Sequence, residues 1–569
     1  MFSFKMSKKK YTVTSALLYA NGPVYIGHVA GAYLPADIYV RYLKGKGHEV
    51  AFISGSDEHG AAITLQAKKE GITPKEIIDK YHYINKDAFS NFGINFSIYH
   101  RTSEKLHHKT AQEVFKKLEN KNIFTKKESN QFYDEENNQF LADRYILGDC
   151  PRCNASNAYG DQCEKCGSAL SPEELINPKS TLSGKTPVKK KTTHWYLPMQ
   201  KHEKWLRKWI EKGELNDTIH HDYKTWKNQV IGQCKSWLDL GLQERAMTRD
   251  LDWGVKLPIK ESEGKVLYVW LDAPIGYISA TKQWAKENGK NWKDYWENED
   301  TQLIHFIGKD NIVFHCIIFP IILKSHGDFI LPTNVPANEF LNLEGKKLST
   351  SRNWAIWLTE YLNDFKGYED SLRYTLCAMA PESKDSDFTW SEFQARNNNE
   401  LVSIYGNFIN RVIVLVNKYW EGNIPIQNNL DNYDNEVLKK LDQFPHKIGS
   451  SIEKFKFREG LSELINLARL GNKYLADKEP WKLKKSDEKK TETIMNIAAQ
   501  IAGNLALLSE PFLPFSSKKL KKMLNISNLS WENADISILK ANHKINNPSH
   551  LFNKIEDDKI NEQLDKLNL

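Results

Sequence analysis

The chain has 569 residues and a formal net charge of +7. At about 150 residues per domain, this length predicts roughly four packing units and excludes a single small binding module. Hydrophobic residues make up 40% of the chain and charged residues 27%, with a mean hydropathy of −0.58, which excludes a disordered or fibrous protein. The weak positive charge is compatible with a polyanionic partner but does not identify one.

No segment of the sequence predicts a membrane span or a secretory signal. The longest apolar stretch, Cys316 to Leu323, contains Pro320 and is far shorter than the roughly 20 residues that cross a bilayer. The N-terminus lacks the apolar region of a signal peptide, and the residues from Met6 resemble a second start. We therefore expect a cytoplasmic protein without a membrane partner.

The opening of the chain predicts a βαβ unit of parallel sheet. Tyr11 to Leu17 is rich in β-forming residues, the segment NGP at residues 21–23 ends this strand, and Gly27 to Tyr42 carries apolar residues at helical spacing. Val50 to Gly55 then has the apolar pattern of a second buried strand. Pro35 lies inside the predicted helix, where we expect a kink or a break.

The pattern changes twice in the rest of the chain. Lys121 to Gly241 includes a cysteine-rich segment and the basic loop Pro178 to Lys191, which indicates an insertion. Apolar runs at Leu267 to Ile278 and Leu303 to Leu323 predict that the sheet resumes. Beyond about Trp390, apolar residues recur at i, i+3 and i+4, which predicts a helical bundle. The bundle segments are Leu401 to Trp420, Val437 to Phe455 and Glu459 to Ala476.

Four of the seven cysteines form two C-x-x-C pairs, CPRC and CEKC, separated by nine residues. Two such pairs surround one tetrahedral zinc ion with thiolates and leave no position open for a substrate. We therefore predict one structural zinc, with reduced and metal-free cysteines as the alternative; its binding energy, on the order of 10 kcal/mol, would order the loop. The predicted ligands are Cys150, Cys153, Cys163 and Cys166, whereas Cys234, Cys316 and Cys377 are scattered, unlike a disulfide framework.

The segment YIGH, Tyr25 to His28, follows the first predicted strand and opens the first helix. A helix N-terminus offers unpaired N–H groups, Gly27 allows a flat base to approach the backbone, and His28 can donate to a phosphate. Taken alone the motif is weak. A capped helix start with a surface histidine is the alternative.

A second candidate for nucleotide binding is the small basic loop GKKLSTSRN, Gly345 to Asn353. Lysine and arginine side chains there can meet a triphosphate, and the serine hydroxyls can donate hydrogen bonds. Most basic loops are simply solvated, so this loop alone does not identify a nucleotide site. The residues concerned are Lys346, Lys347, Ser349, Ser351 and Arg352.

Together, the order and spacing of these motifs resemble the class I aminoacyl-tRNA synthetases, and within that class the methionyl-tRNA synthetases. The class motifs HIGH and KMSKS would here be YIGH and KLSTS. Four longer segments, YANGPVYIGH, GSDEHG, YVWLDAPIGY and FIGKDNIVFH, are similar to the methionine family in particular. Two departures from the class motifs matter, Tyr25 for the first histidine and Thr350 for the second lysine, so we expect His28 and Lys347 to carry the phosphate contacts, with help from Lys346.

The resemblance implies a fold class and a domain order. The implied class is α/β, with a Rossmann-like parallel-sheet catalytic domain, a zinc-knuckle insertion and an all-α anticodon-binding bundle. The implied domains are the first catalytic half (1–120), the connective insertion with the knuckle (121–241), the second catalytic half (242–330), the KMSKS-loop and stem-contact region (331–390) and the anticodon-binding domain with the C-terminal tail (391–569).

The implied reaction joins methionine and ATP into methionyl-adenylate and then transfers methionine to the terminal adenosine of tRNA(Met). The attacking carboxylate is already ionised, so the site must align it with the α-phosphate and place positive charge at the leaving pyrophosphate. His28, Lys347 and Mg²⁺ bound with ATP fit that task. The implied ATP-binding residues are Tyr25, Gly27, His28, Gly308, Asp310, Lys346, Lys347, Ser349 and Ser351.

Methionine selection must distinguish an uncharged, flexible thioether. Apolar fit contributes only about 1 to 3 kcal/mol per methylene, and sulfur contacts to aromatic rings add up to about 1.5 kcal/mol each. Asp57 is implied to hold the substrate ammonium, and the alternative for Trp270 and Tyr277 is a role as ordinary core aromatics. The implied pocket residues are Leu17, Tyr19, Asp57, Trp270, Ala273, Pro274, Tyr277 and His315.

The C-terminal bundle is implied to read the anticodon. Asn407 and Arg411 lie one helical turn apart and can present an amide and a guanidinium to an unstacked base. Trp481 offers a stacking platform worth about 1 to 3 kcal/mol per base. A structural Asn–Arg pair and a buried tryptophan are the alternatives. We expect tRNA(Met) and not DNA as partner, and a monomer.

Two other classes of protein compete with this interpretation. The leucine, isoleucine and valine enzymes of the same class usually carry an editing domain, for which the insertion is too short. A catalytically inactive tRNA-binding scaffold would have no use for His28, Asp57, Asp310 and Lys347. Methionine-dependent exchange of labelled pyrophosphate into ATP separates these alternatives.

Overall fold

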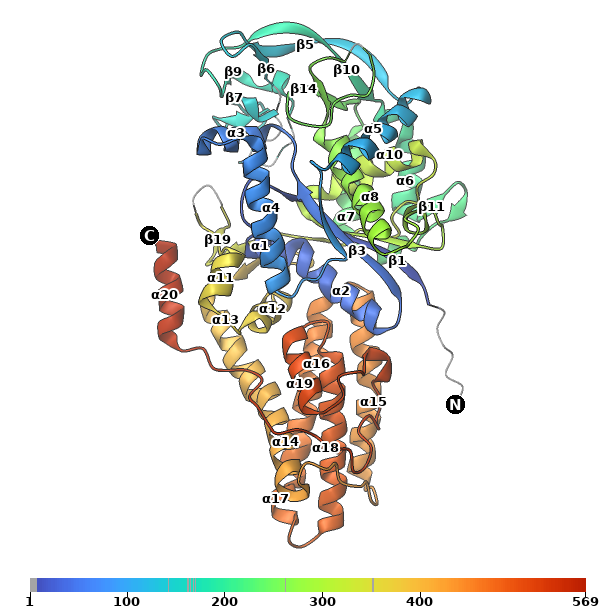
Figure 1. Cartoon of the computed structure of the whole chain (residues 1–569), viewed down its shortest axis with the longest axis vertical. Coiled ribbons are helices and arrows are strands. Elements are labelled where there is room, and N and C mark those ends of the chain that lie inside the picture. Colours follow the sequence, from blue (N-terminus) through green and yellow to red (C-terminus); the bar gives the residue numbers. More distant parts are fainter. Residues whose placement is uncertain are drawn as a thin grey trace.

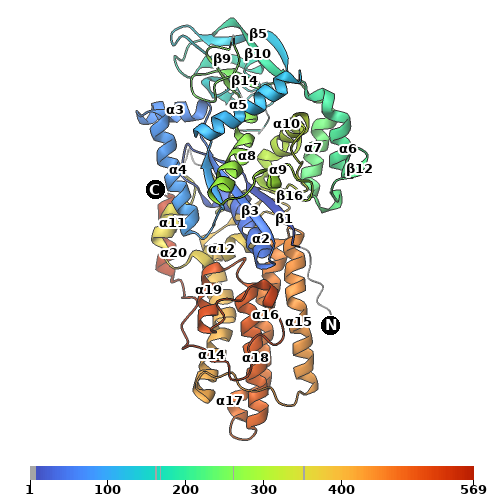
Figure 2. The same cartoon turned by 45° about the vertical axis from the view of Figure 1, so that its right-hand side comes forward.

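The computed structural model describes residues 8–141, 143–160, 163, 165–166, 168, 170–260, 262–349 and 353–568. An α/β body occupies the upper part of Figure 1, and a helical bundle, drawn mainly in orange and red, lies beneath it. A β-rich lobe covers the top of the α/β body (Figure 2). The predicted fold class, a parallel α/β sheet followed by an all-α bundle, is confirmed.

Six parallel strands form the central sheet in the order β17, β16, β1, β3, β2, with β4 also paired to β3. Between β1 and β2, four residue steps (14 to 18) oppose three on β3 (53 to 56). This bulge displaces Ala16 and Leu17 from the regular ladder near the carboxyl edge, where open parallel sheets bind ligands. The strands are β1 (Lys10–Ser15), β2 (Leu18–Tyr19), β3 (Glu49–Asp57), β4 (Ile98–Arg101), β16 (Gln302–Gly308) and β17 (Ala337–Asn338).

One helical run connects β2 to β3 and confirms the predicted βαβ unit. It comprises α1 (Ile26–His28), a π-helical turn (Val29–Tyr33) and α2 (Leu34–Gly45). Pro35 is the second residue of α2, one residue beyond the end of the π turn. Because proline has no N–H and its ring crowds the preceding carbonyl, the wider turn accommodates it within a continuous helix. The expected disturbance at Pro35 is therefore a π bulge.

Helix α8 is the main support of the sheet on the side of the insertion. It packs against β3, β4 and α5. The first half of the helix is buried on nearly every face, from Leu271 to Thr281. The helices of the α/β body after α2 are α3 (Ala61–Glu70), α4 (Pro74–Asn91), α5 (Lys105–Asn120), α8 (Val269–Glu287), α9 (Lys293–Trp296) and α10 (Phe319–His326).

The insertion is a β lobe followed by a short helical arm. An antiparallel sheet has the order β13 (Arg245–Ala246), β10 (Val188–Leu197), β5 (Thr125–Asp134) and β6 (Gln139–Phe140). A smaller sheet, β8 (Ala158–Tyr159), β7 (Ile146–Asp149) and β9 (Ile176–Ser180), supports the cysteine segment. The arm contains α6 (Glu203–Lys212), β11 (Glu214–Leu215), β12 (Thr218–Ile219) and α7 (Asn228–Leu240), and β14 (Thr248–Asp250) with β15 (Lys265–Leu267) leads back to α8.

A last small sheet and three helices precede the bundle, and the chain between α19 and α20 is mostly without regular secondary structure. That sheet is β19 (Lys346–Lys347), β18 (Leu341–Leu343) and β20 (Ser386–Phe388), and α11 (Leu358–Asp364), α12 (Glu369–Ala378) and α13 (Trp390–Arg396) lie around it. A π-helical segment (Asn397–Gly406) leads into the bundle. The bundle helices are α14 (Asn407–Trp420), α15 (Asn432–Glu453), α16 (Phe457–Lys478), α17 (Pro480–Leu483), α18 (Glu488–Leu508) and α19 (Pro514–Met523).

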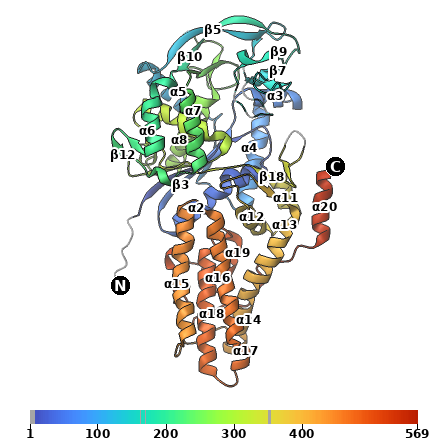
Figure 3. The same ribbon diagram turned by 180° about the vertical axis from the view of Figure 1, so that it is seen from behind.

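The three bundle segments predicted from periodicity are confirmed as helices. The periodicity did not reveal α18, which lies among the other helices in Figure 3. This helix packs against α14, α15, α16 and α19, and its residues from Thr493 to Leu508 are all buried. A helix that is buried all round has no polar face and therefore no amphipathic period.

A buried ion pair joins the α/β body to the bundle. Arg373 on α12 is fully buried and donates to Asp37 on α2 at 2.7 Å. The same guanidinium donates to the carbonyls of Phe512 (3.0 Å) and Pro511 (3.1 Å) before α19. The final helix, α20 (Asp557–Asn568), returns to α13. Across the described residues, no helix combines the length and apolar character needed to cross a bilayer.

Candidate active site

The two segments YIGH and KLSTS meet across the fold. Ile26 donates to the carbonyl of Ile356 at 3.0 Å, and Leu358 donates to the carbonyl of Val24 at 3.0 Å. A Cβ atom at Gly27 would lie 2.6 Å from the Tyr25 ring and 2.8 Å from the Leu348 side chain, so Gly27 packs closely against both. The motifs are 320 residues apart in sequence but in direct contact in space, as the nucleotide-site prediction requires.

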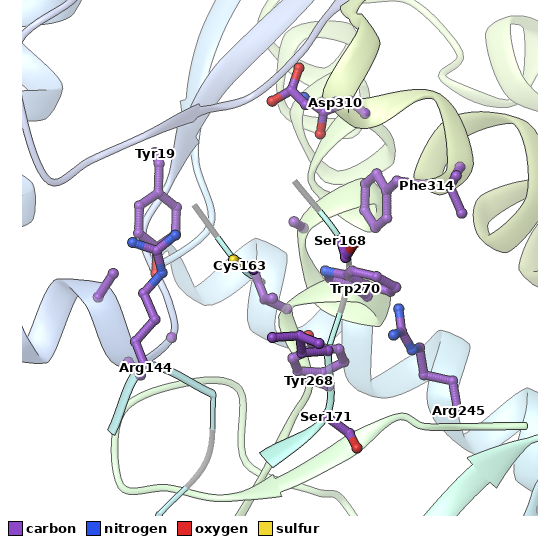
Figure 4. Close-up of a pocket in the computed structure, with 18 of the residues that line it drawn as sticks. Tyr19, Arg144, Cys163, Ser168, Ser171, Arg245, Tyr268, Trp270, Asp310 and Phe314 are labelled. Atoms are coloured by element: carbon purple, nitrogen blue, oxygen red, sulfur yellow. The ribbon is translucent and has the colours of Figure 1, made fainter. Parts of the chain in front are cut away.

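One large cavity of about 2190 Å³ extends from this contact to the β lobe. Tyr25, Asp310, Lys347 and Ser349 line it at the end formed by the two motifs. Figure 4 shows how far the cavity reaches, with Asp310 at one side and residues of the cysteine segment such as Ser168 in the same view. The cavity thus connects the parallel sheet, the basic loop and the insertion.

His28 lies directly behind the cavity wall. Its ring centroid is 3.9 Å from that of Tyr25, and Nδ1 is buried with no hydrogen-bond partner among the described residues. Withdrawal from water lowers the pKa of His28 to about 4, so without ligand the ring is neutral at pH 7. Burial and the nearby Asp310 raise the pKa of Tyr25 to about 12. His28 therefore offers a hydrogen bond rather than a positive charge.

Lys346 and Lys347 of the basic loop have different neighbours. Both lie on β19 and are exposed. Lys347 lines the cavity, whereas the Lys346 ammonium lies 4.5 Å from the ring centroid of Trp354. Ser349 pairs with Trp354 through two backbone hydrogen bonds, which closes the loop at its base. Ser351, with Thr350 and Arg352, lies outside the described residues.

All eight residues predicted for methionine binding line this same cavity, from four different segments of the chain. Tyr19 on β2 pairs with Asp57 at the end of β3, and the other residues come from the β1–β2 bulge, the first turns of α8 and the helix after β16. Gly308 belongs to the end of β16, where a Cβ atom would lie 2.6 Å from Asp310. The residues that line the cavity are Leu17, Tyr19, Asp57, Trp270, Ala273, Pro274, Tyr277 and His315.

Asp57 is the carboxyl group of this pocket. It is 9% exposed, and within the described part of the chain nothing bonds its Oδ1. Burial raises the pKa of Asp57 to about 8, and the neighbouring Asp272 charge contributes. A buried carboxylate oxygen that faces a cavity without a partner is suited to an incoming ammonium group.

The deep end of the pocket carries no charge. His315 is buried, its Nδ1 lies 3.1 Å from the carbonyl of Asn311, and Tyr277 lies 2.9 Å from its Nε2. Burial lowers the pKa of His315 to about 4, so the ring is neutral, donating from Nδ1 and accepting the Tyr277 hydroxyl at Nε2. This apolar, uncharged pocket suits a side chain such as a thioether.

Sequence reasoning missed three groups beside the pocket. The Arg245 guanidinium lies 3.9 Å from the ring centroid of Trp270, and Phe314 packs against the same ring (Figure 4). Asp272, which does not line the cavity, forms a buried ion pair of 2.6 Å with His59, which does. Asp272 lies in the segment WLDAP, where a charged residue within an apolar run was an available signal, whereas His59 in SDEHG had none.

The four cysteines converge as predicted. The Cys150–Cys166 and Cys153–Cys163 sulfur pairs are 3.9 and 3.6 Å apart, and all four sulfur atoms lie within 4.8 Å of one another. Tetrahedral Zn–S bonds of about 2.3 Å place sulfur atoms roughly 3.8 Å apart. Backbone N–H groups of Arg152 and Cys153 bond the Cys150 sulfur, and hydrogen bonds from Ser168 lower the pKa of Cys166 to about 6. The cluster therefore fits one structural metal ion.

The predicted anticodon residues lie in the bundle, away from the cavity. Asn407 begins α14 and is exposed, and the Arg411 guanidinium lies 4.8 Å from the ring centroid of Trp481 on α17. Trp481 is 36% exposed, so it is not a core residue. Helix α17 lies at the far end of the bundle from the α/β body in Figure 1.

Comparison with known proteins identifies the family. A family model described as class I tRNA synthetases (M) matches residues 11–413, and a model described as the anticodon binding domain of methionyl tRNA ligase matches residues 424–568. The chain belongs to the methionine–tRNA ligase family of class I synthetases. Methionine–tRNA ligases of Cytophaga hutchinsonii and Phocaeicola vulgatus are 58% and 60% identical to it, each over 98% of this chain and 81% of the relative.

A solved structure of the family shows the same fold. Methionyl-tRNA synthetase of Mycobacterium tuberculosis, bound by methionyl-adenylate, superimposes with a TM-score of 0.77 over 96% of this chain and 100% of that chain. Sequence identity is 20%, so this likeness concerns the fold. The membership agrees with the resemblance carried by the motifs of the sequence.

Proposed function

We propose that the chain joins methionine to the 3′-terminal adenosine of tRNA(Met), by way of methionyl-adenylate formed from methionine and ATP. The observation that carries this proposal is the contact of Gly27 with Leu348 beside a cavity that also contains Asp57 and the apolar pocket. Methionine-dependent exchange of labelled pyrophosphate into ATP tests it. Exchange driven by leucine, or tRNA binding without exchange, would contradict it.

In the activation step, a methionine carboxylate oxygen bonds to the α-phosphorus as the bond between that phosphorus and the bridging oxygen breaks. Pyrophosphate leaves with the bonding electrons, and no proton is transferred. We propose that Lys347 neutralises the charge that gathers on the leaving group and that neutral His28 donates a hydrogen bond to a phosphate oxygen. Mg²⁺ bound with ATP supplies further positive charge.

The adenosine end of ATP would lie between the two motifs and the end of β16. Tyr25 and Leu348 pack against Gly27, Asp310 packs against Gly308, and Asp310 is placed to accept hydrogen bonds from ribose hydroxyls. Tyr25 and Ser349 line the same end of the cavity. The ammonium of Lys346 lies over Trp354, which favours Lys347 as the lysine that meets the phosphates.

We assign the substrate ammonium to Asp57 and the thioether to the pocket between Trp270 and His315. The orphaned Oδ1 supports the first assignment, and the neutral ring of His315 supports the second. Sulfur contacts with the aromatic rings would supply a criterion that leucine does not meet. With ammonium and side chain held, the carboxylate is directed toward the ATP end of the cavity.

We propose that the four cysteines hold one zinc ion that orders the cysteine segment and takes no part in the reaction. Four thiolates leave no position for a substrate. Elemental analysis should find about one zinc per chain. Chelation should release the metal and increase proteolysis of this segment, and a fully folded chain without metal would contradict the proposal.

We propose that Asn407, Arg411 and Trp481 read the anticodon, with tRNA spanning from the far end of the bundle to the cavity. The exposed tryptophan, stacked by an arginine, suits an unstacked base. Trp481→Ala should lower kcat/KM for tRNA about 5- to 100-fold and leave pyrophosphate exchange unchanged. Because tRNA charging supplies ribosomes, we place the activity in the cytoplasm.

A further inference from the structure

A buried cluster of one carboxylate and two histidines lies under the methionine pocket. Asp272, in the first turn of α8, is fully buried. One carboxylate oxygen bonds His59 Nδ1 at 2.6 Å and the other bonds His107 Nε2 on α5. His107 Nδ1 in turn lies 3.0 Å from the Ser279 hydroxyl. Such a carboxylate would be costly to bury without these donors, so the cluster ties three elements together.

The cluster is connected to the substrate site through the backbone of His59. The His59 N–H bonds the carboxylate of Asp57, and the His59 carbonyl accepts the Tyr19 hydroxyl at 2.6 Å. Asp57 and Tyr19 both line the cavity, whereas Asp272 does not. The orientation of His59 therefore decides where two pocket groups point.

Apart from the Tyr19 hydroxyl on the His59 carbonyl, the other anchors of this turn hold Glu58. Glu58 N–H donates to Thr102 at 2.9 Å, its carbonyl accepts from Trp253 at 2.7 Å, and its carboxylate pairs with Arg101 at 2.8 Å. Among the described side chains, Asp272 is the one that bonds the His59 ring. Loss of Asp272 would therefore free the His59 ring while the turn stays attached through Glu58.

We propose that Asp272 is a positioning residue for methionine: through the His59 imidazole it holds the turn that directs the Asp57 carboxylate at the substrate ammonium. The inference rests on the proposed role of Asp57. Asp272 raises the pKa of His59, so the ring donates a charge-assisted hydrogen bond to it. Methionine binding would thus depend on a residue that does not touch the substrate.

Asp272→Asn tests the proposal in the full chain. Binding of methionine and of 4-(methylthio)butanoate, which lacks the ammonium, is measured by tryptophan fluorescence at about pH 8.5, where Asp57 is mostly ionised and loss of the Asp272 charge has little further effect on its protonation. Loss of one charge-assisted hydrogen bond should weaken methionine about 10- to 100-fold, leaving the desamino acid within twofold and KM for ATP within about threefold. Equal weakening of both acids, or no change in either, would overturn the proposal.

Matched variants separate positioning from general support. His59→Asn keeps an N–H donor near the Nδ1 position and should bind methionine nearly as the parent chain does, whereas His59→Ala should match Asp272→Asn. Ser279→Ala removes the hydroxyl that bonds His107 and the Gly276 carbonyl, leaves both bonds of Asp272 in place, and should lower Tm without weakening methionine binding. If Asp272→Asn does not fold, the two His59 variants still test the proposal. Equal affinity of His59→Asn and His59→Ala for methionine would overturn it.

A double variant shows whether Asp272 acts through Asp57. If it does, Asp57→Asn/Asp272→Asn should bind methionine no more weakly than Asp57→Asn alone, whereas independent effects would add. Additive losses would overturn the inference. If Asp57→Asn itself leaves methionine binding unchanged, the proposed function of Asp57 fails instead, and the two failures are thereby distinguished.

Discussion

The two ends of the active-site cavity are built in opposite ways. At the end proposed for methionine, Asp57 and His315 are buried, and hydrogen bonds hold Tyr277 and His315 together before any ligand arrives. At the end proposed for ATP, Lys347 is exposed on a two-residue strand that leads into a short loop. The comparison teaches that the methionine end is preorganised, whereas the ATP end is completed by its ligand.

This difference predicts two kinds of defect. A change at the buried end should appear as lost methionine affinity, because those contacts exist in the ground state. A change at the exposed end should appear as lost rate, because charge gathers on the phosphates in the transition state. Each of the following variants tests whether defects in affinity and defects in rate are separated in this way.

The largest effect is expected for Asp57→Asn. The substrate ammonium would enter a buried position without a counter-charge, and removal of one partner of a buried ion pair costs about 3 to 5 kcal/mol. KM for methionine in pyrophosphate exchange should therefore rise about 10²- to 4 × 10³-fold. KM for ATP should change less than about threefold, and an equal rise in both constants would break the division.

Lys347→Ala should lower the rate of activation rather than affinity. Loss of one preorganised charge at the leaving pyrophosphate is expected to reduce kcat about 10²-fold, with the methionine Kd unchanged. Lys346→Ala is the matched control, since its ammonium lies over Trp354, and it should stay within about threefold of the parent. A comparable loss in both lysine variants would contradict the assignment of Lys347.

The pocket residues could be predicted because they lie within short segments that resemble a known family. Tyr19, Asp57 and Tyr277 were all found in this way, and each lines the cavity. The support beneath them could not be found. His59 and Asp272 are 213 residues apart, and no local period or spacing signals that their side chains meet.

The same contrast holds for the fold. Amphipathic helices such as α15 can be predicted from the spacing of their apolar residues. Helix α18 has no such spacing, because neighbouring helices cover it on every side. The π turn before Pro35 was foreseen only as a disturbance. Local sequence patterns thus identify helices that have one apolar face. They do not identify a helix that other helices surround, or which buried charges pair, because both depend on contacts between distant parts of the chain.

Methionine binding should depend on pH through Asp57. Its pKa is raised to about 8 in the free protein, so below pH 8 the carboxyl group holds a proton that must leave when the ammonium binds. The methionine Kd should therefore fall about tenfold from pH 6 to pH 7 and level off above pH 8. Calorimetry in two buffers would detect the released proton, and Asp57→Asn should remove the pH dependence. A flat profile in the parent chain would show that this carboxylate is already ionised.

Tyr277→Phe should have the smallest effect and the most specific one. The variant removes the hydroxyl that His315 accepts at 2.9 Å, a hydrogen bond worth about 0.5 to 1.5 kcal/mol, and keeps the aromatic ring. The methionine Kd should rise about three- to tenfold with kcat unchanged. Tyr405→Phe is the matched control, because it removes a buried hydroxyl bonded to Ser509 in the bundle and should affect only stability. If Tyr277→Phe slowed activation without weakening methionine, the buried end would be contributing to the transition state, and the division between the two ends would fail.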